Sequence, residues 1–350
     1  MFKKILLGLA FTAKLMASPS FVPAKPVDTA KYQINGSALC KTAKETLVYL
    51  NRGASYDPLV IREGKVFKLP LAKVKATLEF ICQHQNELND PAFVRQHFEF
   101  IRWYPNLSQA RVIAKNKPLL QNLPQDKILM TKYYIHKARV SSKFTKNYPL
   151  ALYAIPQDEV ILTLEEADAK PELLRFKYGK QAILKGALNK KEVPVLAYLN
   201  REDLEAALLQ GTIIADFKNQ QKTFNVHRSN NIAYDRTKNP YKQERYWYFK
   251  EVKGVKGYGK DADEKITVEP GVTYAADLEN FGLGKLLLIQ YKEGQNTITR
   301  AGIFADTGGA FANNQYQIDF LTGSYAGLDA FYKANHHLPN YVAAYFMVLK

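Results

Sequence analysis

Residues 306–311 read Asp-Thr-Gly-Gly-Ala-Phe, and residues 317–320 read Gln-Ile-Asp-Phe. Asp306 follows the apolar run 301–305, and Asp319 lies inside a second apolar run, so both aspartates lie at predicted strands. Aspartate is depleted in strands, so two of them in neighbouring strands need a reason. One interpretation is turn formation, because Asp-Thr-Gly-Gly is a favourable turn sequence. The other is a carboxylate cluster at the rim of a barrel, where like charges raise a pKa and create a general acid.

A third segment upstream has the same character. Residues 274–277 read Tyr-Ala-Ala-Asp and are followed by Gly-Leu-Gly at residues 282–284. With Asp277, Asp306 and Asp319 in these contexts, the carboxyl-terminal part of the chain resembles the three-aspartate (3D) domain of the membrane-bound lytic transglycosylase A family. Enzymes of that family cleave the glycan strands of bacterial peptidoglycan.

The resemblance extends over residues 125–350. Four further segments occur in the family's order, namely Leu-Met-Thr-Lys-Tyr-Tyr at 129–134, a stretch beginning Tyr-Pro-Leu at 148–156, an acidic segment at 200–207 and an aromatic segment at 246–251. The chain departs from the family pattern at Lys132, which stands in place of glycine, and at 224–231, where the family has a Gln-Gly-Ser-Gly turn. The inserted part is also shorter than the resemblance implies, so its substrate-facing loops differ.

The spacing of apolar residues predicts helices first and strands later. Residues 30–125 have mainly helical periodicity, and after residue 128 short alternating runs with many aromatic residues predict strands. Strands of this kind with glycine-rich turns favour small barrels over a doubly wound parallel sheet. Helices are expected at 71–88, from 91 onward, at 202–210 and at 324–335, and strands at 130–135, 150–153, 159–162, 266–268, 285–291, 299–305, 316–321 and 343–349.

The resemblance implies a more specific architecture. The fold class is mainly β with α, in which a double-psi β-barrel domain is built from residues 20–135 and 246–350, with the amino-terminal helices attached. A second β-barrel domain is inserted at residues 136–245. The glycan would lie in the groove between the two, and a cleft between domains is also the common place for a ligand.

The implied reaction uses one carboxylic acid twice. A lytic transglycosylase needs no water, because the 6-hydroxyl of the muramic acid residue attacks C1 and leaves a 1,6-anhydro ring. The acid must be protonated near neutral pH, although a free aspartic acid has a pKa of about 3.9. Neighbouring carboxylates and partial burial raise that pKa. By resemblance Asp319 is the acid and base, while Asp306 and Asp277 tune it, orient it or bind substrate.

Several other residues are candidates for substrate binding. Gly308 and Gly309, followed by Ala310, leave room for a sugar or another backbone to approach closely. Tyr133 and Tyr134 could stack on sugar faces at the crossing between the domains, and the alternative is that they belong to the barrel core.

Composition narrows the classes of partner. The 350 residues include 49 Lys+Arg against 33 Asp+Glu, a formal charge of +16, which attracts polyanions such as cell-wall carboxylates, anionic lipid or nucleic acid. The lysines are scattered, so a solvated basic surface is the alternative. No nucleic-acid-binding signature accompanies the charge. No His/Cys or His/Glu metal spacing is present either, so we expect no nucleic-acid partner, no metal and no cofactor.

Cys40 and Cys82 are the two cysteines of the chain, and both lie in predicted amphipathic helices. In an exported protein an isolated pair indicates one disulfide. Two buried free thiols are the alternative.

The amino terminus has the pattern of a secretory signal peptide. Two lysines precede the short apolar run 5–13, and small residues follow near residue 17. There is no cysteine at that point for a lipid anchor, so we expect residues 1–17 to direct the protein to the periplasm, within the envelope that includes the outer membrane.

These features together indicate an exported lytic transglycosylase that cleaves the MurNAc-β-1,4-GlcNAc bond of peptidoglycan. Two alternatives share the same barrel: a peptidoglycan-binding protein with reduced or no catalysis, and a hydrolase that leaves reducing ends. Peptidoglycan strands are the expected partner, and other cell-wall enzymes are candidates. The sequence does not specify the oligomeric state.

Overall fold

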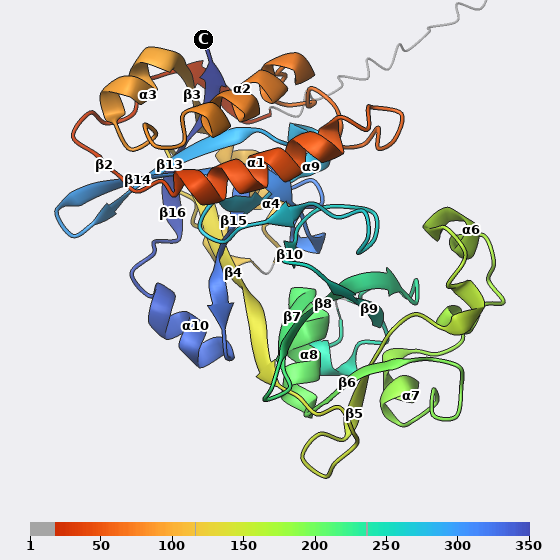
Figure 1. Cartoon of the computed structure of the whole chain (residues 1–350). Helices are drawn as coiled ribbons and strands as arrows, with labels where there is room; N and C mark the ends of the chain where they lie inside the picture. Colours follow the sequence, from red (N-terminus) through yellow and green to blue (C-terminus); the bar gives the residue numbers. More distant parts are fainter. Residues whose placement is uncertain (1–17, 116, 236) are drawn as a thin grey trace, which may run out of the picture.

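The computed structural model describes residues 18–115, 117–235 and 237–350, so the predicted signal peptide lies outside the described residues. Six strands form a closed barrel in the order β16–β13–β14–β12–β15–β4, and pairing of β16 with β4 closes the ring. Figure 1 shows it in the upper half of the molecule. The barrel strands are β4 (Ile128–Arg139), β12 (Thr273–Ala275), β13 (Leu286–Glu293), β14 (Asn296–Asp306), β15 (Gln317–Tyr325) and β16 (Tyr341–Leu349).

The barrel combines parallel and antiparallel pairs. β12 runs parallel to β14 and β15 runs parallel to β4, while the other pairs in the ring are antiparallel. β4 comes from the first half of the chain and the other five strands from the last quarter, so the ring cannot close without both parts. The expected fold class, a mainly β protein with helices and a barrel built from both chain ends, is confirmed.

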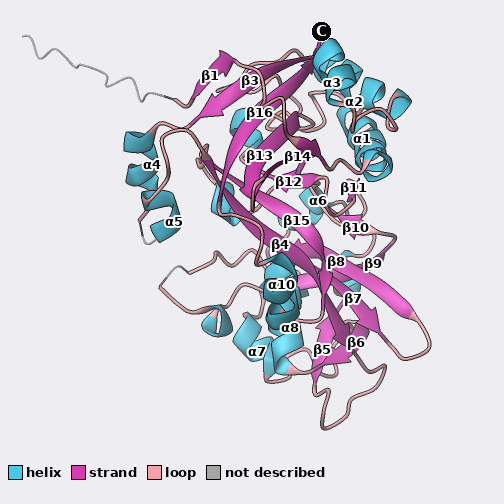
Figure 2. Cartoon of the chain, turned by 90° about the vertical axis from the view of Figure 1, so that its left-hand side faces the viewer, coloured by secondary structure: helices cyan, strands magenta, loops and turns pink. Residues whose placement is uncertain are grey.

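Helices cover two sides of the barrel. Figure 2 shows α1 (Gly36–Leu50), α2 (Leu71–Gln83) and α3 (Pro91–His97) on one side, and α4 (Leu107–Ile113) and α5 (Pro118–Gln121) on the other. Side-chain caps begin several of them: the Asn35 side chain accepts a hydrogen bond from Ala38 N, and that of Asp90 accepts one from Ala92 N. No helix among the described residues is long and apolar enough to cross a bilayer.

One apolar core joins the barrel to α1 and α2. Met130, Ile303 and Phe346 from the barrel are fully or almost fully buried together with Leu50 of α1 and Leu78 of α2. Burial of side chains of this size contributes about 1.5–3 kcal/mol each. The helices are therefore part of the barrel's own core.

The chain between β4 and β9 (Trp247–Val252) forms an inserted unit, which lies below the barrel in Figure 1. The last four residues of β4 pair with β7 (Thr212–Asp216), and β8 (Gln221–Ser229) and β9 continue that ladder. β5 (Leu150–Tyr153) pairs with β6 (Val195–Leu199) in a second ladder. The helices of the insert are α6 (Leu164–Asp168), α7 (Lys180–Leu184) and α8 (Arg201–Gln210).

The two ladders of the insert enclose their own core, which includes Leu152, Leu199 and Phe249. A bridge between Ser141 and Tyr198 links them, so the strand pairs described here follow an open path, unlike the closed ring of the barrel. β4 belongs to both the barrel and the insert. The domain boundaries at 136 and 245 therefore remain a prediction.

The strand predicted at 159–162 is wrong. Residues 157–159 form a 3₁₀ helix, residues 160 and 161 a turn, and residue 162 a bend. Glu159 is fully buried there, and its Oε2 accepts hydrogen bonds from Arg175 at 2.9 Å and from Arg228 at 3.1 Å. A buried carboxylate must be paired, so the backbone follows these contacts instead of extending as its apolar residues suggested.

Two further elements differ from the expectation. The helical region 30–125 contains β3 (Phe98–Tyr104), which lies between β1 (Ser20–Pro23) and β16 and is held by pairs from both neighbours. The helix expected at 324–335 is α10 (Leu328–Asn335), because residues 324 and 325 still pair with β4. In both cases long-range strand pairing overrides local periodicity.

Cys40 on α1 and Cys82 on α2 are joined in a disulfide, the pairing that the sequence analysis anticipated. α1 and α2 lie side by side on the barrel and share its apolar core. The bridge therefore ties together two helices that already pack against one another.

Reducing this bridge should destabilise the protein without unfolding it. The bridge closes a loop of 42 residues, and in the chain-entropy description its loss lowers the free energy of unfolding by roughly 4 kcal/mol. Denaturant unfolding of the wild type and of the Cys40→Ala/Cys82→Ala variant measures the difference. Two thiols that react with a labelling reagent in the unfolded, unreduced wild type would contradict the bond.

Candidate active site

Strand pairing brings two of the three candidate aspartates together. β12 lies between β14 and β15, and its last residue, Ala275, is paired with Asp306 on one side and with Asp319 on the other. On the far side of β15, Asp319 is paired with Thr131 of β4. Segments that are distant in sequence therefore meet across four adjacent strands.

Asp306 is held by two hydrogen bonds. Its Oδ2 accepts from the Tyr133 hydroxyl at 2.7 Å, and its Oδ1 accepts from the backbone N of Thr307 at 2.8 Å. Burial raises the pKa of Asp306 to about 6, although both hydrogen bonds and the charge of Lys265 oppose that rise. The carboxyl is thus fixed in orientation and is mainly ionised at neutral pH.

Asp319, unlike Asp306, has a carboxyl oxygen that no described residue holds by a hydrogen bond. Its Oδ1 is buried and has no hydrogen-bond partner among the described residues. Burial, and then the charge of Asp306, raise the pKa of Asp319 to about 7, whereas the Thr131 side chain and the charge of Lys132 lower it. Asp319 therefore holds its proton more tightly than Asp306, and a large fraction is protonated at neutral pH. This is the arrangement that a general acid requires.

Both carboxyls line a cleft of about 610 Å³ between the barrel and the insert. The barrel side includes Tyr133, residues 306–311 and Asp319, and the insert side includes residues from α8, β7 and β8 together with Trp247. A larger cavity of about 680 Å³ shares His227 and Lys260 with this cleft and contains none of the three aspartates. We assign the site to the cleft because the perturbed carboxyls lie there.

Gly308, Gly309 and Ala310 lie on the cleft wall, as the sequence analysis anticipated. A Cβ atom added at Gly309 would meet nothing within 4 Å, and one at Gly308 would only touch the Phe311 ring at 4.0 Å. Packing within the chain therefore does not require either glycine. Their small size keeps open space that a ligand can use.

Asp277 lies apart from the other two aspartates. It caps α9 (Leu278–Phe281), where its side chain accepts hydrogen bonds from the backbone N of Asn280 at 3.3 Å and from its amide Nδ2 at 2.7 Å. It lines a neighbouring pocket of about 300 Å³ that shares Thr307 and Gly308 with the cleft. The structure thus places Asp277 behind the 307–308 turn.

The candidate tyrosines point to opposite faces of β4, as consecutive strand residues do. Tyr133 faces the cleft and Asp306. Tyr134 is 3% exposed and stacks on Phe331 of α10 with ring centroids 4.7 Å apart. Tyr134 therefore occupies a packing position, and Trp247 provides an aromatic surface on the insert side of the cleft.

Three residues of the site were not singled out as functional by the sequence. Thr131 and Lys132 precede Tyr133 on β4, and the charge of Lys132 acts on Asp319. Lys265 lies between β10 (Val255–Lys256) and β11 (Thr267–Val268), and its Nζ donates to Asn225 Oδ1 at 2.7 Å and to Val226 O at 2.9 Å. Lys132 could have been found from its replacement of a glycine, but nothing in the sequence places Lys265 next to β8.

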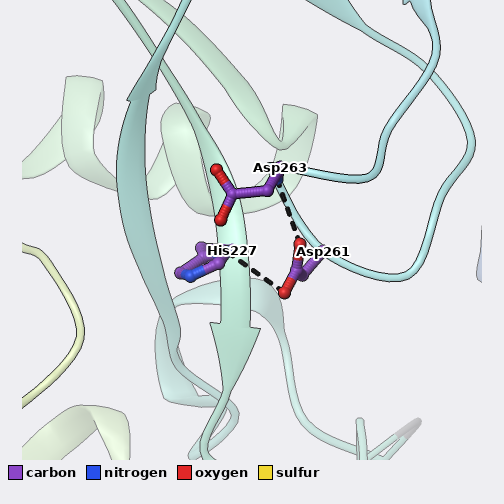
Figure 3. Close-up of side chains that lie close together, drawn as sticks. All are labelled: His227, Asp261 and Asp263. Carbon is purple, nitrogen blue, oxygen red and sulfur yellow. Dashed lines mark hydrogen bonds and ion pairs between the residues drawn. The ribbon is translucent and has the colours of Figure 1, made fainter. Parts of the chain in front are cut away.

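One group of side chains has the composition of a metal site. His227, Asp261 and Asp263 bring their ligand atoms within 4.8 Å of one another, the one such group found among the residues described (Figure 3). However, His227 Nδ1 accepts a hydrogen bond from Ala262 N at 3.2 Å, and Asp263 is paired with Lys250 at 2.6 Å. These contacts attach the loop before β11 to β8 and β9, which accounts for the group without an ion.

The raised pKa of Asp319 predicts a specific dependence of stability on pH. The folded state binds this proton more tightly than the unfolded chain, so its stabilising effect is present below the unfolded pKa and is lost as pH rises through about 7. Asn cannot ionise, so Asp319→Asn should melt at the same or a higher temperature than the wild type at about pH 8, with the gap narrowing toward about pH 5. Thermal melts over this range measure it, with the exposed Asp329→Asn as the control for a lost charge. A markedly lower melting temperature of Asp319→Asn at the alkaline end would contradict the prediction.

We compared the sequence and the fold with those of known proteins. No family model and no curated protein matches the sequence. Among solved structures, a membrane-bound lytic murein transglycosylase from Agrobacterium tumefaciens superposes with a TM-score of 0.65 at 16% identity, covering 94% of this chain and 97% of that one. E. coli MltA with bound chitohexaose gives 0.58 at 13% identity, covering 96% of each chain, and MltA from Neisseria gonorrhoeae gives 0.54 at 14%, covering 94% and 96%. Over nearly its whole length, this chain has the fold of the MltA-type lytic transglycosylases.

Proposed function

We propose that this chain is a peptidoglycan lytic transglycosylase in which Asp319 is the single acid and base. The observation that carries the proposal is the state of Asp319: its pKa is raised to about 7, its buried Oδ1 has no hydrogen-bond partner among the described residues, and it lies on the wall of a cleft of about 610 Å³. The fold shared with lytic transglycosylases supports it, and E. coli MltA has been solved with chitohexaose bound.

The proposed reaction has two proton transfers at Asp319. First, the protonated carboxyl donates to the glycosidic oxygen as the bond between C1 of MurNAc and O4 of GlcNAc breaks, and the GlcNAc leaves with a 4-hydroxyl. The carboxylate then accepts the proton of the MurNAc 6-hydroxyl as its oxygen bonds to C1. The products are a 1,6-anhydroMurNAc end and a regenerated acid, and no water is consumed.

Asp306 has a different task in this mechanism. Its hydrogen bonds from Tyr133 and Thr307 hold a carboxylate beside Asp319, and its negative charge raises the pKa of the acid. A fixed carboxylate also stabilises the positive charge that develops at C1. Asp277 is proposed as a positioning residue, because its cap of α9 supports the backbone that contacts the 307–308 turn; Thr307 Oγ1 donates to Ala276 O at 2.7 Å.

Export to the periplasm is part of the proposal, because the glycan substrate lies outside the cytoplasm. It is supported by the pattern of residues 1–17 and by the disulfide, which persists in oxidising compartments. Cell fractionation with sequencing of the mature amino terminus tests it; recovery of the reduced protein from the cytoplasm would contradict it.

Digestion of purified sacculi tests the reaction itself. The wild type should release anhydromuropeptides, whereas Asp319→Asn should lose at least the factor of about 10²–10⁴ that general acid–base catalysis supplies. Mass spectrometry of the products separates the alternatives: reducing muropeptides would indicate hydrolysis, and binding without products would indicate a binding protein. Substantial activity in Asp319→Asn would refute the assignment of the acid.

Asp306→Asn should change the pH profile instead of abolishing activity. It removes a like charge beside Asp319, so the pKa of the acid falls, and the pH at which activity is lost on the alkaline side moves below about 7. Because Asn is also a good helix cap, Asp277→Asn should stay close to the wild type and serves as a matched control. Rates of anhydromuropeptide release between about pH 4 and pH 9 measure all three proteins. An Asp306→Asn profile that coincides with that of the wild type would remove Asp306 from the mechanism.

A further inference from the structure

Basic side chains gather in the cleft from separate parts of the chain. Its wall contains five Lys or Arg residues but only two carboxyls, those of Asp306 and Asp319. The basic residues are Lys132 on β4, Arg245 before β9, Lys256 on β10, and Lys260 and Lys265 between β10 and β11. Four of the five lie between residues 245 and 265, and Lys132 contributes to the cleft wall from the barrel while its Nζ bonds to the segment before β16.

Neutral groups, and not acids, hold most of these cations. Lys132 Nζ donates to Pro339 O at 3.1 Å and to Asn340 Oδ1 at 2.8 Å, and Lys256 Nζ donates to Thr267 Oγ1 at 3.0 Å. The Arg245 guanidinium lies 5.1 Å and 5.9 Å from the ring centroids of Tyr234 and Trp247.

Lys265 is likewise bonded to an amide and a carbonyl oxygen. Lys260 alone has an ion-pair partner, Glu165 at 2.8 Å. Among the residues described, no carboxylate lies within 4 Å of the charged nitrogens of the other four.

This arrangement is unfavourable in the empty cleft. Lys132, Arg245 and Lys265 are partly buried, and this burial lowers the pKa of Lys132 and Arg245 and lowers that of Lys265 to about 8. Partly buried cations are normally paired with acids, because desolvation is otherwise uncompensated. The two carboxyls of the cleft wall, Asp306 and Asp319, lie more than 4 Å from the charged nitrogens of these side chains, so they act on them only at a distance. An anionic ligand would supply the missing partner.

We propose that the cleft selects glycans that carry carboxylate groups, with Lys132, Arg245 and Lys256 as the side chains that bind them. This inference rests on the proposed function and makes its substrate more specific. Lys132 stands where the resembled motif has glycine, so this part of the selectivity belongs to the present chain. In peptidoglycan the carboxylate has two sources, the free lactyl group of a muramic acid without a peptide and the stem peptide when one is attached.

Equilibrium binding to Asp319→Asn, which prevents turnover, tests the proposal. The probes are neutral chitohexaose, a peptide-free glycan of equal length with free lactyl carboxylates, the same glycan with those groups converted to methyl amides, and a glycan that carries stem peptides. We expect a carboxylate-bearing glycan to bind on the order of ten-fold more tightly than chitohexaose. This preference should shrink between about 50 mM and about 200 mM salt.

Matched variants assign the preference to the cleft. Lys132→Met and Lys256→Met keep the length of the side chain and remove its charge, and Arg245→Gln keeps a polar group without charge. Each should weaken binding of the charged glycans while chitohexaose affinity stays within about two-fold, which also reports that the cleft is folded. Lys292→Met removes one exposed charge outside the cleft and should change neither.

The outcomes are distinct. Loss of affinity on amidation identifies the lactyl carboxylate as the source, and tighter binding only of the peptide-bearing glycan identifies the stem peptide. The proposal is overturned if chitohexaose binds as tightly as both charged glycans, or if the variants lower the affinity for all glycans equally. Either result would do so even if digestion of sacculi still yields anhydro products. Failure of every glycan to bind would instead count against the proposed function.

Discussion

Ala275 is paired with Asp306 on one neighbouring strand and with Asp319 on the other, and this shared pairing determines the site. A shift of either register by one residue would turn one carboxyl to the opposite face of the barrel. Every barrel strand has two neighbours in the closed ring, and the β12–β14 register itself shifts between Tyr274 and Ala275, which brings Asp306 opposite Ala275. The register, and hence the proximity of the two acids, is a property of the whole barrel.

The site combines two kinds of unfavourable burial. Burial raises the pKa of Asp306 and Asp319 above that of a free aspartate, and several cations of the same cleft have no carboxylate within 4 Å among the described residues. Each is expected to lower the stability of the empty protein. Strained or poorly satisfied groups persist only where the surrounding structure holds them, here a core continuous with α1 and α2 and a disulfide between those helices.

Contacts between barrel and insert give the cleft its shape. β4 is continuous between the two, and its Lys132 and Tyr133 form part of the barrel wall of the cleft. On the other side, Lys265 bonds to Asn225 and Val226, and Ala262 bonds to His227, which fixes the loop before β11 against β8. The departures of residues 224–231 from the family pattern therefore lie at a junction between the two units, where substitutions alter the cleft without disturbing the acids.

Local patterns in the sequence, namely alternating apolar residues, glycine-rich turns and acids in apolar runs, predicted small barrels, most of the barrel strands and a carboxylate cluster. The construction of the barrel from distant parts of the chain was implied by the family resemblance, and the disulfide pair by the expected export. The local patterns mispredicted residues 159–162 and missed β3, because Glu159 and the 98–104 segment take their conformation from partners far away in sequence. Only the tertiary structure shows that Asp277 lies apart from the other two acids and that Tyr134 packs against Phe331. It also shows that Lys132, Arg245, Lys256 and Lys265 line one cleft. The burial of a side chain and the charges near it depend on residues that are close in space but distant in sequence, so local sequence patterns do not reveal them.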